Sequence, residues 1–142
     1  MKALKGLLCI LLVVFSSSFI FVGCKEDKKV QDKTFCEIIS EITGENVTIP
    51  SEAPFGVTIG ADDSYCEIDT NPFDIEDYSS STILSYIEQM NKKLELPDYL
   101  YNDMLHTSYS QGKQEETFNK IKVKYYYSPD KGLNVSYYRI AE

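Results

Sequence analysis

An apolar segment near the start of the chain, ending abruptly in charged residues, constrains the fold more than any other feature. Lys2 and Lys5 precede an almost unbroken apolar run over residues 7–15. A positive start, an apolar stretch and small residues before a cleavage point are typical of a secretory signal. Residues 7–22 are fewer than the ~20 apolar residues that a permanent membrane-spanning helix needs. An uncleaved membrane anchor is therefore the alternative.

The segment closes on Phe21-Val22-Gly23-Cys24, which resembles the lipobox of bacterial lipoproteins. The resemblance implies that Cys24 receives a diacylglycerol and that cleavage occurs on its N-terminal side. Lipoboxes prefer Leu at the first position, where this chain has Phe. An ordinary leader with a chance cysteine is the other interpretation, but a charged run begins directly after Cys24. We expect residues 1–23 to be a lipoprotein signal peptide.

This expectation places the mature protein on the extracytoplasmic side of the cell membrane or outer membrane, with the membrane as a partner through the lipid on Cys24. Residues 24–33 contain Val30 as their only large apolar side chain, so they predict a flexible tether. Removing 23 of the 142 residues leaves 119, enough for a single domain over residues 34–142.

The net charge of the chain limits which classes of partner this domain can bind. The full chain carries −8, and losing the two leader lysines gives −10. A nucleic-acid partner is excluded, because affinity for phosphates needs clustered Lys and Arg. The distribution is uneven, since residues 52–77 hold eight carboxylates and no basic residue, whereas residues 120–142 hold five basic and two acidic residues.

Periodic patterns predict the elements of the domain. Residues 34–43 form a helix with a capping box at its start and Gly44 at its end. Alternation over residues 55–59 and 65–70 predicts a hairpin. A second helix begins at one of the serines of 79–81 and ends before Pro97.

The C-terminal third is less uniform. Residues 97–106 fit either a helix or a strand, and we favour a helix. Residues 107–116 are expected to be a polar loop. The closing segment predicts the best hairpin of the chain, with a turn over residues 128–132. The predicted fold class is α+β: a small antiparallel sheet of two hairpins packed against two or three helices, with one disulfide.

The cysteines supply that disulfide. Cys9 leaves with the leader and Cys24 is acylated, so Cys36 and Cys66 remain as a pair in an exported protein. A bond between them would contribute ~3–4 kcal/mol by the loop-entropy argument. A metal-binding or reactive thiol pair is the alternative, but the C-x-x-C spacing is missing.

Cys36, Thr43, Gly44 and Cys66 resemble the pattern of small actinobacterial lipoproteins of unknown function. These families are similar to the Mog1/PsbP-type α/β sandwich, an antiparallel sheet backed by helices. The resemblance covers residues 34–70 and implies a fold without an activity.

Candidate chemistry is sparse. His106 is the only histidine, and no nucleophile motif accompanies it, so we assign no catalytic residue and no cofactor. The carboxylates of residues 69–77 lack EF-hand spacing, and a solvated acidic face is favoured over a calcium site, so we assign no metal.

The terminal hairpin is the predicted interaction surface. Its alternation places Lys120, Lys122, Lys124 and Tyr126 on one exposed face, opposite an apolar face that packs against the second helix. This face would suit a protein or glycan partner in the envelope, with an anionic partner favoured by its lysines. The alternative is a hairpin whose lysines only keep it soluble.

Taken together, the sequence favours a membrane-anchored bacterial lipoprotein that serves as a binding or envelope-interaction module. Two other classes remain open. One is an envelope enzyme with a site assembled from His106 and scattered carboxylates, and the other is a purely structural envelope protein.

Overall fold

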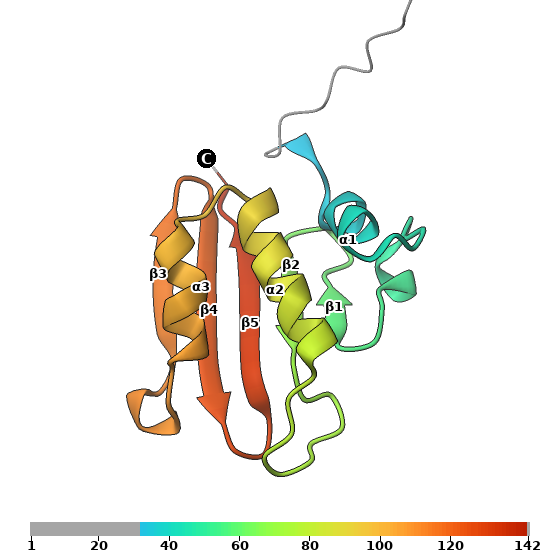
Figure 1. Cartoon of the computed structure of the whole chain (residues 1–142). Coiled ribbons are helices and arrows are strands. Elements are labelled where there is room, and N and C mark those ends of the chain that lie inside the picture. Colours follow the sequence, from blue (N-terminus) through green and yellow to red (C-terminus); the bar gives the residue numbers. More distant parts are fainter. Residues whose placement is uncertain (1–31, 142) are drawn as a thin grey trace, which may run out of the picture.

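The computed structural model of the chain describes residues 32–141 (Figure 1). The predicted signal peptide, the lipidation site Cys24 and residues 25–31 of the predicted tether lie outside the described residues. Lys33, the last residue of that tether, already belongs to the domain. Its ammonium group pairs with the Glu41 carboxylate at 2.7 Å, and its backbone carbonyl accepts a hydrogen bond from Arg139.

Within residues 32–141 the chain forms helices and strands in mixed order. The helices are α1 (Phe35–Thr43), α2 (Ser81–Lys93), α3 (Asp98–Leu105) and the short 3-10 helices η2 (Pro50–Glu52) and η3 (Tyr109–Gln111). The strands are β1 (Val57–Ile59), β2 (Tyr65–Asp69), β3 (Gln114–Phe118), β4 (Ile121–Ser128) and β5 (Gly132–Arg139). The predicted α+β class is confirmed.

The five strands form a single antiparallel sheet in the order β1-β2-β5-β4-β3, and α1, α2 and α3 cover one of its faces (Figure 1). The two predicted hairpins are joined by pairing of β2 with β5, where Cys66 lies opposite Tyr137. The opposite face of the sheet carries no helix of the described chain.

The core lies between the sheet and the helices. Its completely buried side chains include Phe35, Ile38, Ile39, Ile68, Ile87, Leu100, Val123, Val135 and Tyr137. The Tyr137 hydroxyl donates a 2.7 Å hydrogen bond to the Asn91 side-chain oxygen, so the largest buried polar side chain is satisfied. This packing fixes which face of each strand points away from the helices.

Local signals set the helix ends. Thr34 and Glu37 form the expected capping box of α1, and Gly44 ends the helix with φ +74°. Ser80, one of the three candidate serines, caps α2 through the backbone amide of Ile83. The helical interpretation of residues 97–106 is confirmed by α3.

The prediction of a polar loop over residues 107–116 is wrong at its end, because β3 begins at Gln114. Its outward residue Glu115 lies opposite Lys124, and Phe118 lies opposite Ile121. Edge strands need few apolar residues, since cross-strand charge pairs can stabilise their exposed side. The apolar alternation used to recognise strands is therefore absent from β3.

The predicted disulfide is not formed in this structure: Cys36 and Cys66 are free thiols, both buried. The two side chains lie at different depths. Cys36 borders a surface hollow beside Ser40 and Thr48, whereas Cys66 has no exposed surface. Burial raises the pKa of both thiols, with a further contribution from the Asp63 carboxylate. Both cysteines are therefore protonated at neutral pH.

We expect both cysteines to be alkylated when the chain is unfolded in denaturant without a reducing agent. A protonated thiol is a poor nucleophile, so each should resist oxidation while the domain is folded. Peptide mass mapping should find Cys36 and Cys66 on separate, alkylated peptides. In the folded chain Cys36 should react before Cys66. Recovery of the two peptides joined to each other would contradict this expectation.

Candidate binding face

The face of the sheet opposite the helices gathers side chains from four strands. Strand alternation directs Lys122, Lys124 and Tyr126 of β4 to this side, opposite Tyr138, Ser136 and Asn134 of β5 respectively. Pairing of β2 with β5 adds residues from β2, and β3 adds residues from the edge. The added side chains are Tyr65, Glu67, Asp69, Glu115 and Thr117. We call this surface the open face.

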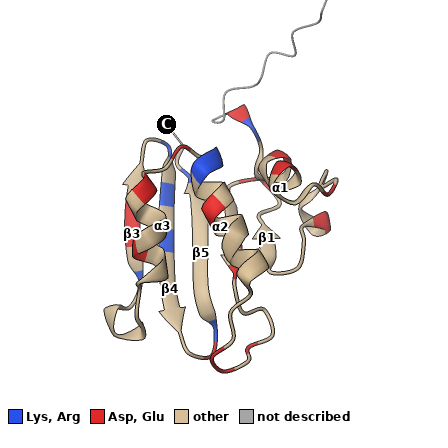
Figure 2. Cartoon of the chain, in the orientation of Figure 1, with Lys and Arg blue, Asp and Glu red and all other residues tan. Residues whose placement is uncertain are grey.

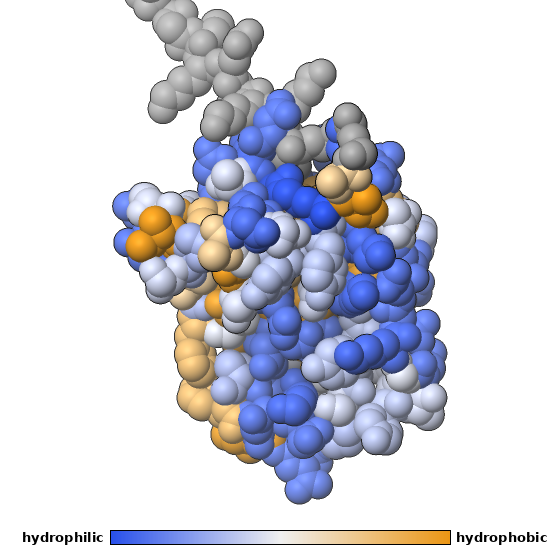
Figure 3. Space-filling view, turned by 180° about the vertical axis from the view of Figure 1, so that it is seen from behind, coloured by the Kyte–Doolittle hydropathy of each residue, from blue (hydrophilic) through white to orange (hydrophobic). Residues whose placement is uncertain are grey.

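The open face is largely hydrophilic. Seen from behind, the centre of the molecule is mostly blue to white, and hydrophobic residues lie mainly at its margins (Figure 3). The residues of β4 that alternate with these polar side chains are buried on the helix side of the sheet: Ile121, Val123 and Tyr125. The polar and apolar sides of the terminal hairpin are thus separated by the sheet itself.

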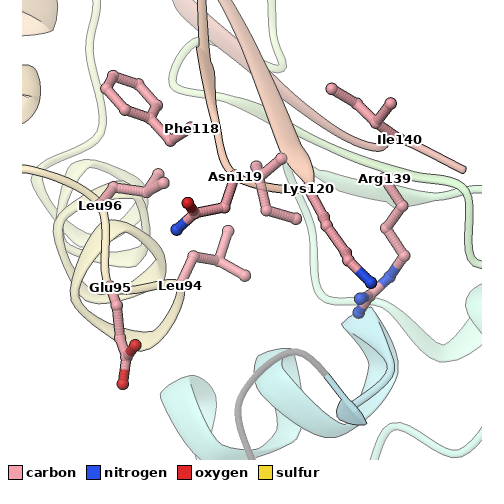
Figure 4. A pocket seen from close by; sticks show the side chains of 9 residues that line it. Leu94, Glu95, Leu96, Phe118, Asn119, Lys120, Arg139 and Ile140 are labelled. Atoms are coloured by element: carbon pink, nitrogen blue, oxygen red, sulfur yellow. The ribbon is translucent and has the colours of Figure 1, made fainter. Parts of the chain in front are cut away.

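Lys120 lies elsewhere. It occupies the turn between β3 and β4 and lines a pocket of about 220 Å³ with Leu94, Leu96 and Phe118 (Figure 4). In this view Lys120 and Arg139 extend toward the start of α1, away from the two leucines. The structure therefore brings Lys122, Lys124 and Tyr126 together and separates Lys120 from them.

The lysines of the open face are paired. Glu115 lies 3.3 Å from the ammonium group of Lys122 and 3.1 Å from that of Lys124. Figure 2 shows the basic residues of β4 beside the acidic residues of β3. The ammonium group of Lys124 also lies 5.4 Å from the centre of the Tyr138 ring, and that of Lys113 lies 5.4 Å from the Tyr126 ring.

Formal charges on and around the open face nearly balance. The face itself carries Lys122 and Lys124 against the carboxylates Glu67, Asp69 and Glu115, and Lys113, which borders it beside Tyr126, brings the sum to zero. The sequence alone suggested a basic surface, because β3 was not recognised as the neighbour of β4. A balanced surface has no strong attraction for an anionic partner.

A hollow of about 170 Å³ lies between β2, β5 and β4 on this face. Its lining includes Glu67, Lys124, Tyr126, Asn134, Ser136 and Tyr138. The Asn134 side-chain amide donates a 2.8 Å hydrogen bond to Glu67, which orients both groups. Burial, together with Glu67 and Asp69, raises the pKa of Tyr126. Its hydroxyl therefore stays protonated and can both donate and accept.

Tyr126 and Tyr138 contribute aromatic rings to the lining of the hollow. The Tyr65 ring lies beside it, with its centre 6.1 Å from that of Tyr138. Polar donors and acceptors beside aromatic rings suit a ligand that has both hydroxyl groups and apolar C–H surfaces.

Most candidates for an enzyme site are positioned apart from this face, and Asp69 of β2 is the exception. His106 is exposed at the end of α3, and its ring Nδ1 lies 2.7 Å from the backbone oxygen of Asn102 on the same helix. The acidic residues 69–77 belong to the end of β2 and the connection to α2. Among residues 32–141, no group of three or more His, Cys, Asp or Glu side chains is arranged to hold a metal ion.

Sequence reasoning missed most of the open face. The β5 residues Asn134, Ser136 and Tyr138 were not identified, although the predicted hairpin places them beside β4. Glu67 was missed because only the pairing of β2 with β5 brings it to this face. The alternation of Tyr138, Ser136 and Asn134 with buried residues of β5 was the available signal, but it does not reveal that β2 is the second neighbour of β5.

No protein-family model matches the chain, and no curated protein or solved structure is significantly similar to it. The resemblance to small actinobacterial lipoproteins therefore stays a prediction. None of the helices between residues 32 and 141 combines the length and the apolar character of a membrane-spanning segment.

The lysine pair should control the titration of Glu115. Hydrogen bonds from Lys124 and then Lys122 lower the pKa of this carboxyl group. Replacing Lys124 with Met should raise the pKa toward its ordinary value, and Lys122→Met should raise it less. NMR titration of the side-chain carboxyl signal measures both changes. Lys113→Met is the control, because its ammonium group faces Tyr126, and it should leave the Glu115 pKa unaltered.

The same pairing sets a direction for stability. A lowered folded-state pKa stabilises the fold above the pKa of the unfolded chain, and the contribution is lost as the pH falls through the lower, folded-state pKa. Because Glu115 and both lysines are at least a third exposed, the effect on unfolding should be small. An acid-unfolding midpoint that moves strongly in Lys124→Met would contradict this view of the pair.

Proposed function

We propose that this chain is a lipid-anchored bacterial lipoprotein whose domain binds a carbohydrate of the cell envelope through the open face. The observation that carries the proposal is the hollow bordered by Tyr126 and Tyr138 on a sheet surface where lysines and carboxylates nearly balance. The lipid on Cys24 would hold the domain at the extracytoplasmic side of a membrane, within reach of envelope polymers.

The chemistry of the hollow fits a sugar better than a charged partner. A sugar ring has an apolar face that can lie on an aromatic ring and a rim of hydroxyl groups that both donate and accept. Tyr126 and Tyr138 supply the rings, while Glu67, Asn134 and Lys124 supply acceptors and donors for the hydroxyls. A ligand with net charge would compete with the ion pairs that Lys122 and Lys124 form with Glu115.

Anchoring and binding are compatible in geometry. Arg139, at the end of β5, donates a hydrogen bond to the backbone oxygen of Lys33, so the start of the described chain and the end of β5 lie at the same end of the domain (Figure 1). The strands extend away from that end of the domain. If the domain is anchored there, the open face would be oriented roughly perpendicular to the membrane surface. Sugar chains could then reach the hollow from the side.

The anchor is tested by Cys24→Ser. If Cys24 is acylated, this variant should leave the detergent phase after phase separation, because one or more acyl chains supply the membrane affinity. Cys36→Ser is the matched control and should stay in the detergent phase. Should the Cys24→Ser protein remain in membranes with its leader still attached, the anchor is an uncleaved helix.

The binding face is tested with the Cys24→Ser protein on insoluble peptidoglycan and on a printed array of bacterial oligosaccharides. We expect retention on at least one of these sugars, and binding at least ~10-fold weaker for Tyr126→Ala and Tyr138→Ala, which corresponds to ~1.4 kcal/mol. Tyr99→Ala, at an exposed tyrosine on α3, is the control and should bind normally. Equal retention of all variants, or of none including the parent, would refute the carbohydrate proposal.

A further inference from the structure

A second surface, separate from the open face, exposes aromatic side chains where the chain enters α2. Phe55 is 60% exposed and Phe73 is 61% exposed, and their ring centres are 4.8 Å apart. The Tyr78 ring lies 6.3 Å from Phe73 in an edge-on arrangement. We call these three residues the aromatic patch. They come from the segment before β1 and from the connection between β2 and α2.

A groove runs beside the aromatic patch. It encloses about 340 Å³, and its lining is mostly apolar and rich in rings: Pro54, Phe55, Pro72, Phe73, Tyr78, Ile83 and Tyr86. Figure 3 also shows hydrophobic residues at the margin of the molecule on the β1 side. A groove lined by aromatic rings and prolines accommodates an extended segment with an apolar or proline side chain.

The loop that carries Phe73 is firmly held. The side chain of Asn71 is completely buried and donates hydrogen bonds to the backbone oxygens of Ile75 at 2.7 Å and of Asp130 at 2.9 Å. The backbone amide of Ile75 returns a bond to the Asn71 side-chain oxygen, and the backbone amide of Asp77 donates to Pro129. Phe73 is therefore displayed on a loop with a defined conformation.

The position of Phe55 is equally constrained. Gly56 follows it with φ +83°, and a Cβ at that position would lie 2.9 Å from the backbone oxygen of Asp69 and 2.6 Å from the Ile83 side chain. The Asp69 backbone amide donates to the Gly56 oxygen at 2.8 Å. The close approach that only glycine permits places Phe55 against Phe73.

Folding alone does not account for this arrangement. Leaving two phenylalanine rings more than half in water forgoes burial that would stabilise each by roughly 1.5–3 kcal/mol. Ordered, contiguous exposed apolar groups mark interaction sites in soluble domains. Order in the free domain also lowers the entropy that a partner must overcome on binding.

The charge around the groove identifies the chemistry of that partner. Glu45 lines the groove, and Glu76 and Asp77 lie in the same exposed loop as Phe73. Lys131, which contacts the same loop, is paired with Asp74 at 3.2 Å. The surroundings are therefore acidic and would attract a basic segment while repelling acidic ones.

We propose that this groove is a docking site for an extended, basic segment of a partner protein, with an aliphatic or proline side chain seated on the aromatic patch. The rings and prolines supply the apolar contact, and Glu45, Glu76 and Asp77 select for Lys and Arg beside it. The proposal is independent of the carbohydrate proposal, because it uses none of the residues of the open face.

The test is selection of a random peptide library displayed on phage against the full chain in detergent. Selected peptides should carry Lys or Arg on either side of an aliphatic or proline residue. A synthetic copy of the most enriched peptide should bind at least ~10-fold more weakly to Phe55→Ser/Phe73→Ser. Tyr99→Ser/Tyr109→Ser removes two equally exposed rings from elsewhere and should bind the peptide normally.

A second variant keeps the rings and alters only charge. Glu76→Lys/Asp77→Lys should lose the basic peptide, and the affinity of the unmodified chain should fall as salt is raised. Circular dichroism should show that every variant is folded. The proposal is overturned if selection enriches no peptide, if the enriched peptides are not basic, or if the ring and charge variants bind them unchanged. Dimers in ultracentrifugation that Phe55→Ser/Phe73→Ser dissolves would also overturn it, in favour of self-association.

Discussion

The antiparallel pairing of β2 with β5 is the constraint on which the rest of the structure depends. A hairpin alone is at best marginally stable in water, whereas a sheet of several strands backed by helices is stable. This pairing joins the N-terminal hairpin to the C-terminal strands and sets Cys66 opposite Tyr137 in the core. The same register places Glu67 opposite Ser136 on the other side of the sheet. The hydrogen bonds between β2 and β5 therefore define both the core and the open face.

Features with local signals were predictable from the sequence. The capping box at Thr34 and the glycine after Thr43 correctly predicted the two ends of α1. The alternation of apolar and polar residues in β4 and β5 predicted the terminal hairpin. Long-range features were not. Strand β3 has almost no apolar pattern, because Glu115 is stabilised by lysines of the neighbouring strand. Counting cysteines predicted a disulfide, but it could not show that Cys36 and Cys66 lie at different depths.

The open face illustrates how cross-strand neighbours alter the meaning of a sequence pattern. The alternating lysines of β4 suggest a basic stripe when read along one strand. Across the sheet, each outward lysine meets a carboxylate or a tyrosine ring, and Lys120 turns toward a different pocket. These contacts across the sheet neutralise the lysines, so they remove the reason to favour an anionic partner over the glycan that the sequence also allowed.

The contacts of Arg139, at the end of β5, affect how the domain would respond to a pulling force. Its guanidinium group stacks 4.5 Å from the Phe35 ring, bonds Asp63 at 3.0 Å and reaches the backbone of Lys33. A pull applied through Lys33 would load these contacts, which tie the start of α1 to the central strand. The applied force would break these side-chain contacts one after another. The longer hydrogen-bond ladder between β4 and β5 would resist a larger force. Under traction on Lys33, the first turn of α1 would therefore detach while the strands of the open face stay paired.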